Sequence, residues 1–118
     1  MKEKVLWRKA EQGEIRFSSL QGYITITYGE LVEKLGPPHD TDIDGKVQAE
    51  WRLMVSGAPC TIYDYKHLGG LHTVKDWHIG GHDTVEACKA VKDLFPNHKI
   101  VVPGMSNTDL FASGYYEK

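Results

Sequence analysis

The fold is decided by the stretch Trp77-His78-Ile79-Gly80-Gly81-His82-Asp83. Its first residues alternate between apolar and polar, which is typical of a strand with one buried face. Asp83 stands three residues before Glu86, the spacing of a helix N-terminal cap. An apolar stripe at helical spacing follows and ends before Pro96. We therefore expect a strand over 73–79, a turn at the two glycines and a helix over 84–95.

A similar junction lies upstream. Residues 23–27 alternate strictly and are β-branched or aromatic, which predicts a strand. Thr27 and Glu30 then have the spacing of a capping box, and an apolar helical stripe follows them. Gly36 supplies a C-terminal cap, so we expect a helix over 28–35.

A hairpin is predicted between the two junctions. Residues 46–55 alternate without a break, and residues 60–66 return as a second strand after a turn. If Gly57-Ala58 is the centre of the turn, Trp51 faces Asp64 on the core side. Asp64 would then need either water at the strand end or a backbone or indole N–H to bind.

The same register sets the outer side of the hairpin. It places Arg52 opposite Tyr63 and Glu50 opposite Tyr65, on the face away from the helices. Asp76 and His78 of the next strand should point to that same face. A slip of one residue would invert both faces.

The order β-α-β-β-β-α predicts an α+β fold: an antiparallel sheet of three to four strands with two helices on one face. The ends of the chain have weaker periods, apart from a short apolar run at 100–102 that could add an edge strand. We therefore expect an N-terminal extension over 1–20, a core domain over 21–96 and a C-terminal tail over 97–118.

Composition narrows the function. A chain of 118 residues with a formal charge of −2 lacks the basic footprint of a general nucleic-acid binder. Cys60 and Cys88 form no metal or redox motif and are expected to be reduced core thiols. No window has the length of a membrane span, and the first 13 residues lack a signal-peptide core. We expect a soluble cytoplasmic protein that does not contact membranes.

Catalysis and metal binding find no support in the motifs. No serine or cysteine stands in an activating context. Four histidines (residues 67, 72, 78 and 82) fit no zinc spacing, and the aspartates of 40–44 fail as a calcium loop because Trp51 occupies the position of the ligand glutamate. We therefore predict no enzyme activity, no cofactor and no metal.

Two surfaces are candidates for binding. Gly80-Gly81 precede a helix N-terminus, where a phosphate could bind, although Asp83 would compete for the same donors and favours a purely structural turn. His78 and His82 lie at its rim. The other candidate is the outer sheet face, where tyrosines and an arginine could contact a protein or stack on a base. The alternative for that face is an ordinary solvated sheet surface. Its predicted members are Glu50, Arg52, Tyr63, Tyr65, Asp76 and His78.

Four segments resemble small proteins common in bacteriophage genomes. They are Gly22 to Pro37, Lys46 to Trp51, Ile62 to Lys66 and Trp77 to Gly81. The resemblance covers roughly residues 21–95 and implies an origin more than an activity.

Small accessory phage proteins of this kind often counter host defence, by blocking a defence protein or by sequestering a signal nucleotide. Together with the outer sheet face, this leads us to expect a non-enzymatic phage accessory protein of the host cytoplasm that inhibits a host defence factor. It would use the face of Arg52, Tyr63 and Tyr65, and could add the aromatic tail, to bind a host protein or to form a homo-oligomer. The alternative is a protein that binds a phosphate-bearing nucleotide between the glycine turn and the tyrosines.

Overall fold

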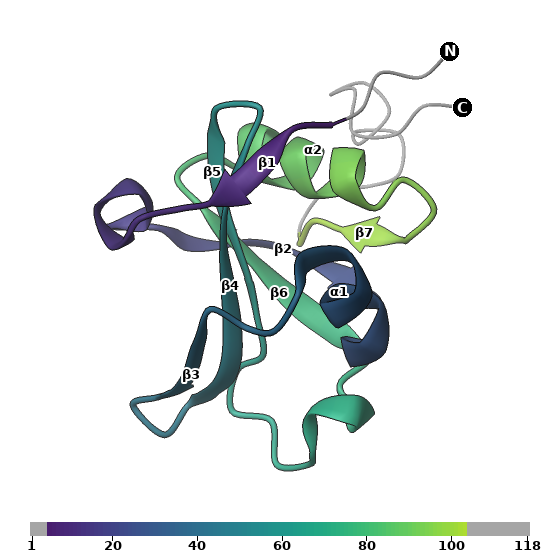
Figure 1. Ribbon diagram of the computed structural model, residues 1–118. Helices are drawn as coiled ribbons and strands as arrows, with labels where there is room; N and C mark the ends of the chain where they lie inside the picture. Colours follow the sequence, from purple (N-terminus) through teal and green to yellow (C-terminus); the bar gives the residue numbers. More distant parts are fainter. Residues whose placement is uncertain (1–4, 104–118) are drawn as a thin grey trace.

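The sheet is built around the long hairpin of β4 (Val47–Val55) and β5 (Ala58–Tyr63), as the computed structural model of the chain shows (Figure 1). The structure describes residues 5–103. Within them, seven antiparallel strands follow the order β1-β4-β5-β6-β2-β7, with β3 paired to β4. The other elements are β1 (Trp7–Lys9), η1 (Gln12–Ile15), β2 (Ser19–Thr25), α1 (Tyr28–Leu35), β3 (Asp40–Ile43), η2 (Leu71–Thr73), β6 (Asp76–Gly81), α2 (Thr84–Leu94) and β7 (Ile100–Val101).

The α+β class is confirmed, but the prediction of three to four strands is wrong. The missed strands β1 and β3 have three and four residues, too few for a two-residue period to stand out. β1 pairs with β4, so part of the expected extension 1–20 belongs to the sheet. β7 likewise belongs to the sheet from within the expected tail 97–118. The aromatic part of that tail, 104–118, lies outside the described residues.

The hairpin register also differs from the prediction. Its turn is centred on Ser56-Gly57, both with positive φ, instead of Gly57-Ala58. Two left-handed residues make the turn whose twist matches that of the strands. Glu50 therefore pairs with Tyr63, and Arg52 with Thr61. Because each partner moves by two residues, every side chain keeps its predicted face.

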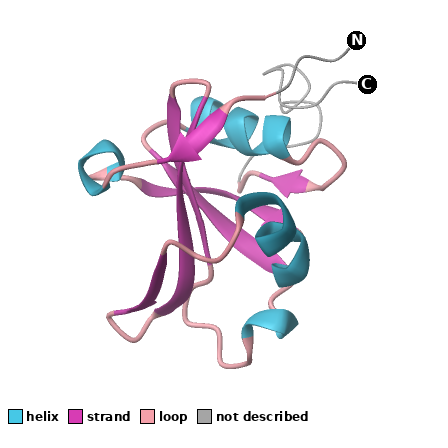
Figure 2. Ribbon diagram, in the orientation of Figure 1, coloured by secondary structure: helices cyan, strands magenta, loops and turns pink. Residues whose placement is uncertain are grey.

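Both helices pack on one face of the sheet, and η1 lies on the other (Figure 2). The helix over 28–35 is confirmed, including the reciprocal Thr27–Glu30 capping box. The helix predicted over 84–95 is confirmed as α2, with Asp83 accepting a hydrogen bond from the backbone N–H of Glu86. Within the described residues, neither helix has the length and apolar character needed to span a bilayer.

The core centres on two tryptophans. Trp51 of β4 and Trp77 of β6 are fully buried, and their ring centroids lie 5.5 Å apart. Tyr28 of α1 stacks against Trp77 at 6.3 Å. The Trp51 indole N–H donates to the carbonyl of Gly36, so the core ring also fixes the end of α1.

Asp64 explains how the hairpin ends. Its carboxylate is buried and accepts hydrogen bonds from the backbone N–H groups of Gln48 and Ala49, at 2.8 and 3.0 Å. The Gln48 side-chain amide donates to it as well. The sequence left water, a backbone N–H or an indole N–H as partners for Asp64, and the structure shows backbone N–H groups. The carboxylate satisfies two donors of β4 where β5 no longer pairs with it.

The two glycines of the opening stretch lie inside β6, beyond the predicted end of that strand. Gly81 pairs with Cys60 on one side and Ser19 on the other. A Cβ on Gly81 would lie 2.5 Å from the Cβ of Ala87. Gly81 is therefore where α2 comes closest to the sheet, a contact that only glycine allows.

Gly81→Ala should lower the free energy of unfolding by about 1–3 kcal/mol, because α2 has to move away from the sheet. Gly13→Ala is the matched control, since a Cβ there meets nothing within 4 Å. Urea denaturation measures both variants. Equal stabilities of the two would show that α2 does not pack on Gly81 as described.

Asp64→Ala should lower the free energy of unfolding by about 2–4 kcal/mol, because it leaves the buried N–H groups of Gln48 and Ala49 without an acceptor. Asp93→Ala removes an exposed partner of Lys89 on α2 and should lower the free energy of unfolding by only about 0.3–0.5 kcal/mol. Thermal and urea unfolding compare them. A cost at Asp64 no larger than at Asp93 would contradict its role at the hairpin end.

A tyrosine face as the candidate functional site

One row of residues crosses four strands on the face opposite the helices. The register pairs Tyr23 of β2 with His78 of β6, His78 with Tyr63 of β5, and Tyr63 with Glu50 of β4. Residues opposite one another in antiparallel strands project to the same side. With Tyr65, which follows β5 and reaches the same histidine, these residues form what we call the tyrosine face: Tyr23, Glu50, Tyr63, Tyr65 and His78.

The rings of the tyrosine face surround His78. The centroid of its imidazole lies 4.9 Å from Tyr23, 5.2 Å from Tyr63 and 5.9 Å from Tyr65. The Tyr63 ring stacks on it at an interplanar angle of 27°. Tyr65 is 43% exposed, and the other rings are half-buried. The chain thus holds three phenol rings in fixed positions at a surface that the helices do not cover.

Burial keeps the aromatic part of this face uncharged. It lowers the pKa of His78, against the charge of Asp64 and the backbone of Tyr63, and so favours the neutral imidazole. Among the described residues, the buried Nδ1 of His78 has no hydrogen-bond partner. Burial, followed by the charge of Glu50, raises the pKa of Tyr63 to about 12. Glu50 is therefore the charged residue among these five, and the ammonium of Lys66 lies over the Tyr65 ring, 5.3 Å from its centroid.

Glu50 is itself in a desolvated position. Burial raises the pKa of its carboxyl, the negative charge of Asp40 raises it further, and Arg52 acts in the opposite direction. Asp40 lies directly across from Glu50, in β3. A groove of about 600 Å³ opens beside Glu50, with Gln12 of η1 and Asp42 of β3 among its lining residues.

Arg52 does not lie on the tyrosine face as an available cation. It is 6% exposed, and its guanidinium pairs with Asp40 and donates to the carbonyl of Ala10 at 3.0 Å. Its backbone N–H donates to Nδ1 of His39. The expectation that Arg52 flanks the tyrosines as a contact residue is therefore corrected: it anchors β3 and the segment before η1 to the sheet.

The remaining predicted site residues have different positions. Asp76 lies on the outer face and accepts a hydrogen bond from the Thr25 hydroxyl at 2.7 Å. Gly80 faces Thr61 and the Tyr63 ring, where a Cβ would lie 2.3 and 3.2 Å from their nearest atoms. Its missing side chain leaves room for that ring.

The opening stretch does not form an anion cradle. The backbone of Gly80 and Gly81 is paired within the sheet, and Gly81 faces α2. His82 is exposed, and its Nε2 lies 2.8 Å from the carbonyl of Arg16. The structure thus unites Glu50, Tyr63, Tyr65 and His78 in one site, with Asp76 and Gly80 beside it. Of the other predicted members, Arg52 is engaged by Asp40 and Ala10, Gly81 faces α2, and His82 contacts the carbonyl of Arg16.

Tyr23 is the member of the site that sequence reasoning missed. The alternation of 23–27 places its side chain on the face opposite Ile24, but nothing local shows that β2 pairs with β6. That pairing joins residues more than 50 positions apart, so no short-range pattern contains it.

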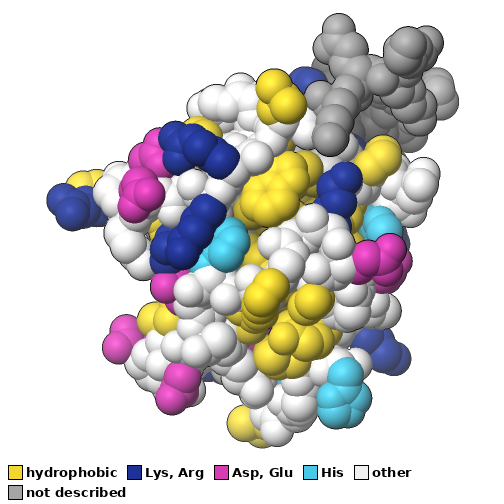
Figure 3. Space-filling model, in the orientation of Figure 1, with side chains coloured by type: hydrophobic (Ala, Val, Ile, Leu, Met, Phe, Trp, Pro, Cys, Tyr) yellow, Lys and Arg dark blue, Asp and Glu magenta, His cyan; other side chains and the backbone are white. Residues whose placement is uncertain are grey.

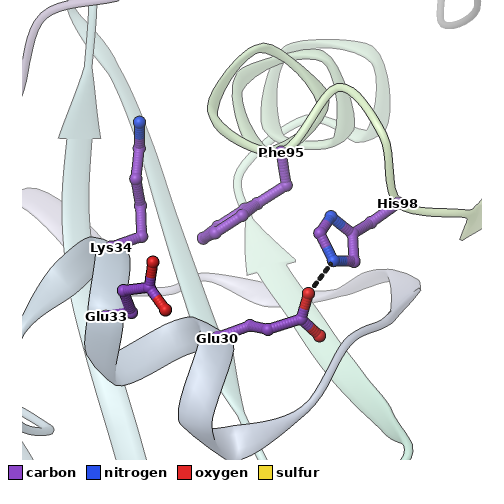
Figure 4. Close-up of a pocket in the computed structure, with 5 residues that line it drawn as sticks. All are labelled: Glu30, Glu33, Lys34, Phe95 and His98. Carbon is purple, nitrogen blue, oxygen red and sulfur yellow. Dashed lines mark hydrogen bonds and ion pairs between the residues drawn. The ribbon is translucent and has the colours of Figure 1, made fainter.

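A second cavity, of about 260 Å³, lies between α1 and the end of α2 (Figure 4). Glu30 and His98 point toward each other across it, with Nε2 of His98 2.8 Å from a carboxylate oxygen of Glu30. This bond, together with the capping bonds to Thr27, lowers the pKa of Glu30. The pair joins α1 to the chain before β7.

Comparison with known proteins leaves the site to be interpreted from its geometry. No protein-family model, curated protein or solved structure matches the chain. Within residues 5–103, no three histidine, cysteine or carboxylate side chains are placed to share a metal ion. Cys60 and Cys88 are both free and buried, and burial raises the pKa of each thiol to about 12.

The Glu30–His98 contact predicts a pH dependence of stability. A carboxyl whose pKa is lowered by folding stabilises the native state above its unfolded pKa, near 4.5, and this contribution is lost as the pH falls through the folded value. In Glu30→Gln, the fall in unfolding free energy below pH 4.5 should be shallower, while Gln can still cap α1.

Glu33→Gln is the control, since Glu33 lines the same cavity without a hydrogen bond in the described structure. Urea denaturation between neutral and acidic pH provides the measurement. Parallel curves for wild type and Glu30→Gln would contradict the pairing.

Proposed function

We propose that this protein is a non-enzymatic binding protein that uses the tyrosine face to hold and inhibit a host protein. The observation that carries the proposal is the cluster of Tyr23, Tyr63 and Tyr65 around His78 on the sheet face opposite the helices. The resemblance of four segments to small phage proteins supports a host factor, such as a defence protein, as the target, and the host cytoplasm as the place of action.

Tyrosine suits a protein interface for physical reasons. Its ring brings a large contact area with few rotatable bonds, and its hydroxyl can bond at the wet rim of the contact. Interface hot spots are accordingly rich in tyrosine. The rings here are already ordered by their packing on His78, so little side-chain entropy is lost when a partner covers them.

A phosphate-bearing nucleotide is the second candidate, because exposed rings on a sheet can stack on a base. The charges of the face weigh against it. Glu50 and Asp76 are acidic, and the guanidinium of Arg52 is already paired with Asp40. The ammonium of Lys66 lies over the Tyr65 ring, 5.3 Å from its centroid, where a base would have to stack. A protein partner therefore fits the face better than a phosphate does.

Tyr65→Ala should reduce capture of the host partner by about tenfold or more, since it removes an exposed ring from the centre of the contact. Val85→Ala on α2 is the matched control, because both side chains are 43% exposed and only Tyr65 lies on the tyrosine face. Affinity capture from bacterial host lysate followed by native mass spectrometry quantifies the bound partner and the oligomeric state together.

Equal capture by the Tyr65→Ala and Val85→Ala variants would overturn the proposed surface. A bound nucleotide in the same spectra, lost from the Tyr65 variant, would favour the second candidate. A homo-oligomer lost from that variant would make a second copy the partner.

A further inference from the structure

The partner's chemistry can be inferred from Glu50, and this step rests on the proposed function. Glu50 lies directly across from Tyr63, at the boundary between the tyrosine face and the groove beside it. Its carboxylate is half-buried, and no ion pair or hydrogen bond of its side chain occurs within the described residues. A desolvated carboxylate of this kind gains free energy when a cation reaches it.

Within the described residues, no cation of the protein is bonded to that carboxylate, although the charge of Arg52 lowers its pKa. Arg52 points to Asp40 and to the carbonyl of Ala10, so its guanidinium is already used. None of the residues that line the groove is a lysine or an arginine. His39 lines it too, but its Nδ1 accepts a hydrogen bond from the backbone N–H of Arg52, and burial and the charges of Lys9 and Arg52 lower its pKa.

Other residues of the groove beside Glu50 are also negatively charged. Asp42 and Asp44 line the groove on the side of the β3 hairpin, which β3 forms with the start of β4. They form no ion pair in the part of the chain that the structure describes. In the view of Figure 3, acidic side chains mark the edge where this hairpin lies, and basic side chains gather over β1. The carboxylates that line the groove thus favour a cationic partner over an anionic one.

The Tyr63 ring adds a second form of recognition. Tyr63 lies directly across from Glu50 on the adjacent strand, and its phenol is uncharged. A guanidinium can lie against such a ring while it donates to a carboxylate next to it, which an ammonium does less well. A ring and a desolvated carboxylate side by side therefore select arginine over lysine.

We propose that the partner presents an exposed arginine that enters the groove between η1 and the β3 hairpin, where Glu50 binds its guanidinium and the Tyr63 ring packs beside it. The tyrosine face then covers the apolar surroundings of that arginine on the partner protein. Charge complementarity makes the occupant a basic protein segment.

Fluorescence anisotropy with a labelled hepta-arginine peptide tests this at low ionic strength, where surface charge is least screened. Hepta-lysine should bind more weakly than hepta-arginine, and hepta-glutamate should not bind. Glu50→Gln should weaken hepta-arginine binding by about tenfold.

Glu33→Gln changes the net charge by the same amount on α1, outside the groove, and should leave the affinity near that of wild type. Tyr63→Leu, a second variant, should reduce the preference for arginine over lysine. Thermal unfolding of each variant checks that the fold is retained.

Equal affinities of Glu50→Gln and Glu33→Gln would overturn the proposal, as would binding of hepta-glutamate as tight as that of hepta-arginine. A homodimer that hepta-arginine dissociates would assign the groove to a second copy and overturn the separate basic partner.

If the Tyr65→Ala variant loses the host partner while hepta-arginine does not bind, the proposed function stands and the arginine contact fails. If hepta-arginine binds through Glu50 but the Tyr65→Ala variant still captures the host partner, the arginine contact stands and the proposed function fails.

Discussion

The rest of the structure depends on the two-faced packing of β6. Trp77 and Ile79 are fully buried in the core, whereas His78, the residue between them, projects to the opposite face among the tyrosines. Because side chains alternate along a strand, one short segment builds the centre of the core and the centre of the candidate site. The two glycines that follow extend this double role: Gly81 admits α2 on one face, and Gly80 leaves room for the Tyr63 ring on the other. Fold and site are thus fixed by the same strand.

Arg52 and Glu50 show how charge is divided between fold and site. They lie two residues apart on the same face of β4, yet Arg52 is buried and bonded to Asp40 and Ala10, while Glu50 faces an open groove. The arginine holds β3 and the N-terminal segment against the sheet. That arrangement leaves an acidic, tyrosine-lined surface, whose charge favours a basic protein segment over a nucleotide.

Local chemistry was enough to predict both helices and β4. The capping residues Thr27 and Asp83 mark helix starts, and strict alternation marks the long strand. The short apolar run at 100–102 indicated an edge strand, found as β7. The strands β1 and β3 could not be predicted in this way, because their pairing is decided by the long-range fit of a few residues. The hairpin register failed for a related reason: Ser56 takes a left-handed conformation that serine rarely adopts, and only the complete turn favours it.

The site was predicted in part. Alternation assigned Glu50, Tyr63 and His78 to the outer face, but not the meeting of Tyr23 with His78, which depends on β2 pairing with β6. The burial of Arg52 was beyond prediction because its partner Asp40 belongs to a segment that reads as an acidic loop. An anion site at the glycines stayed open beside the favoured structural turn, because the sequence ahead of a helix does not show whether a strand continues through it.

The central claim is that the tyrosine face is the surface that contacts the partner, and site-specific photo-crosslinking tests it most directly. A benzoylphenylalanine residue is placed at position 65 or at position 85, and each protein is irradiated in host lysate. The account predicts a discrete crosslinked host protein from position 65 and none from position 85. The same product from both positions, or a product from position 85 alone, would contradict it.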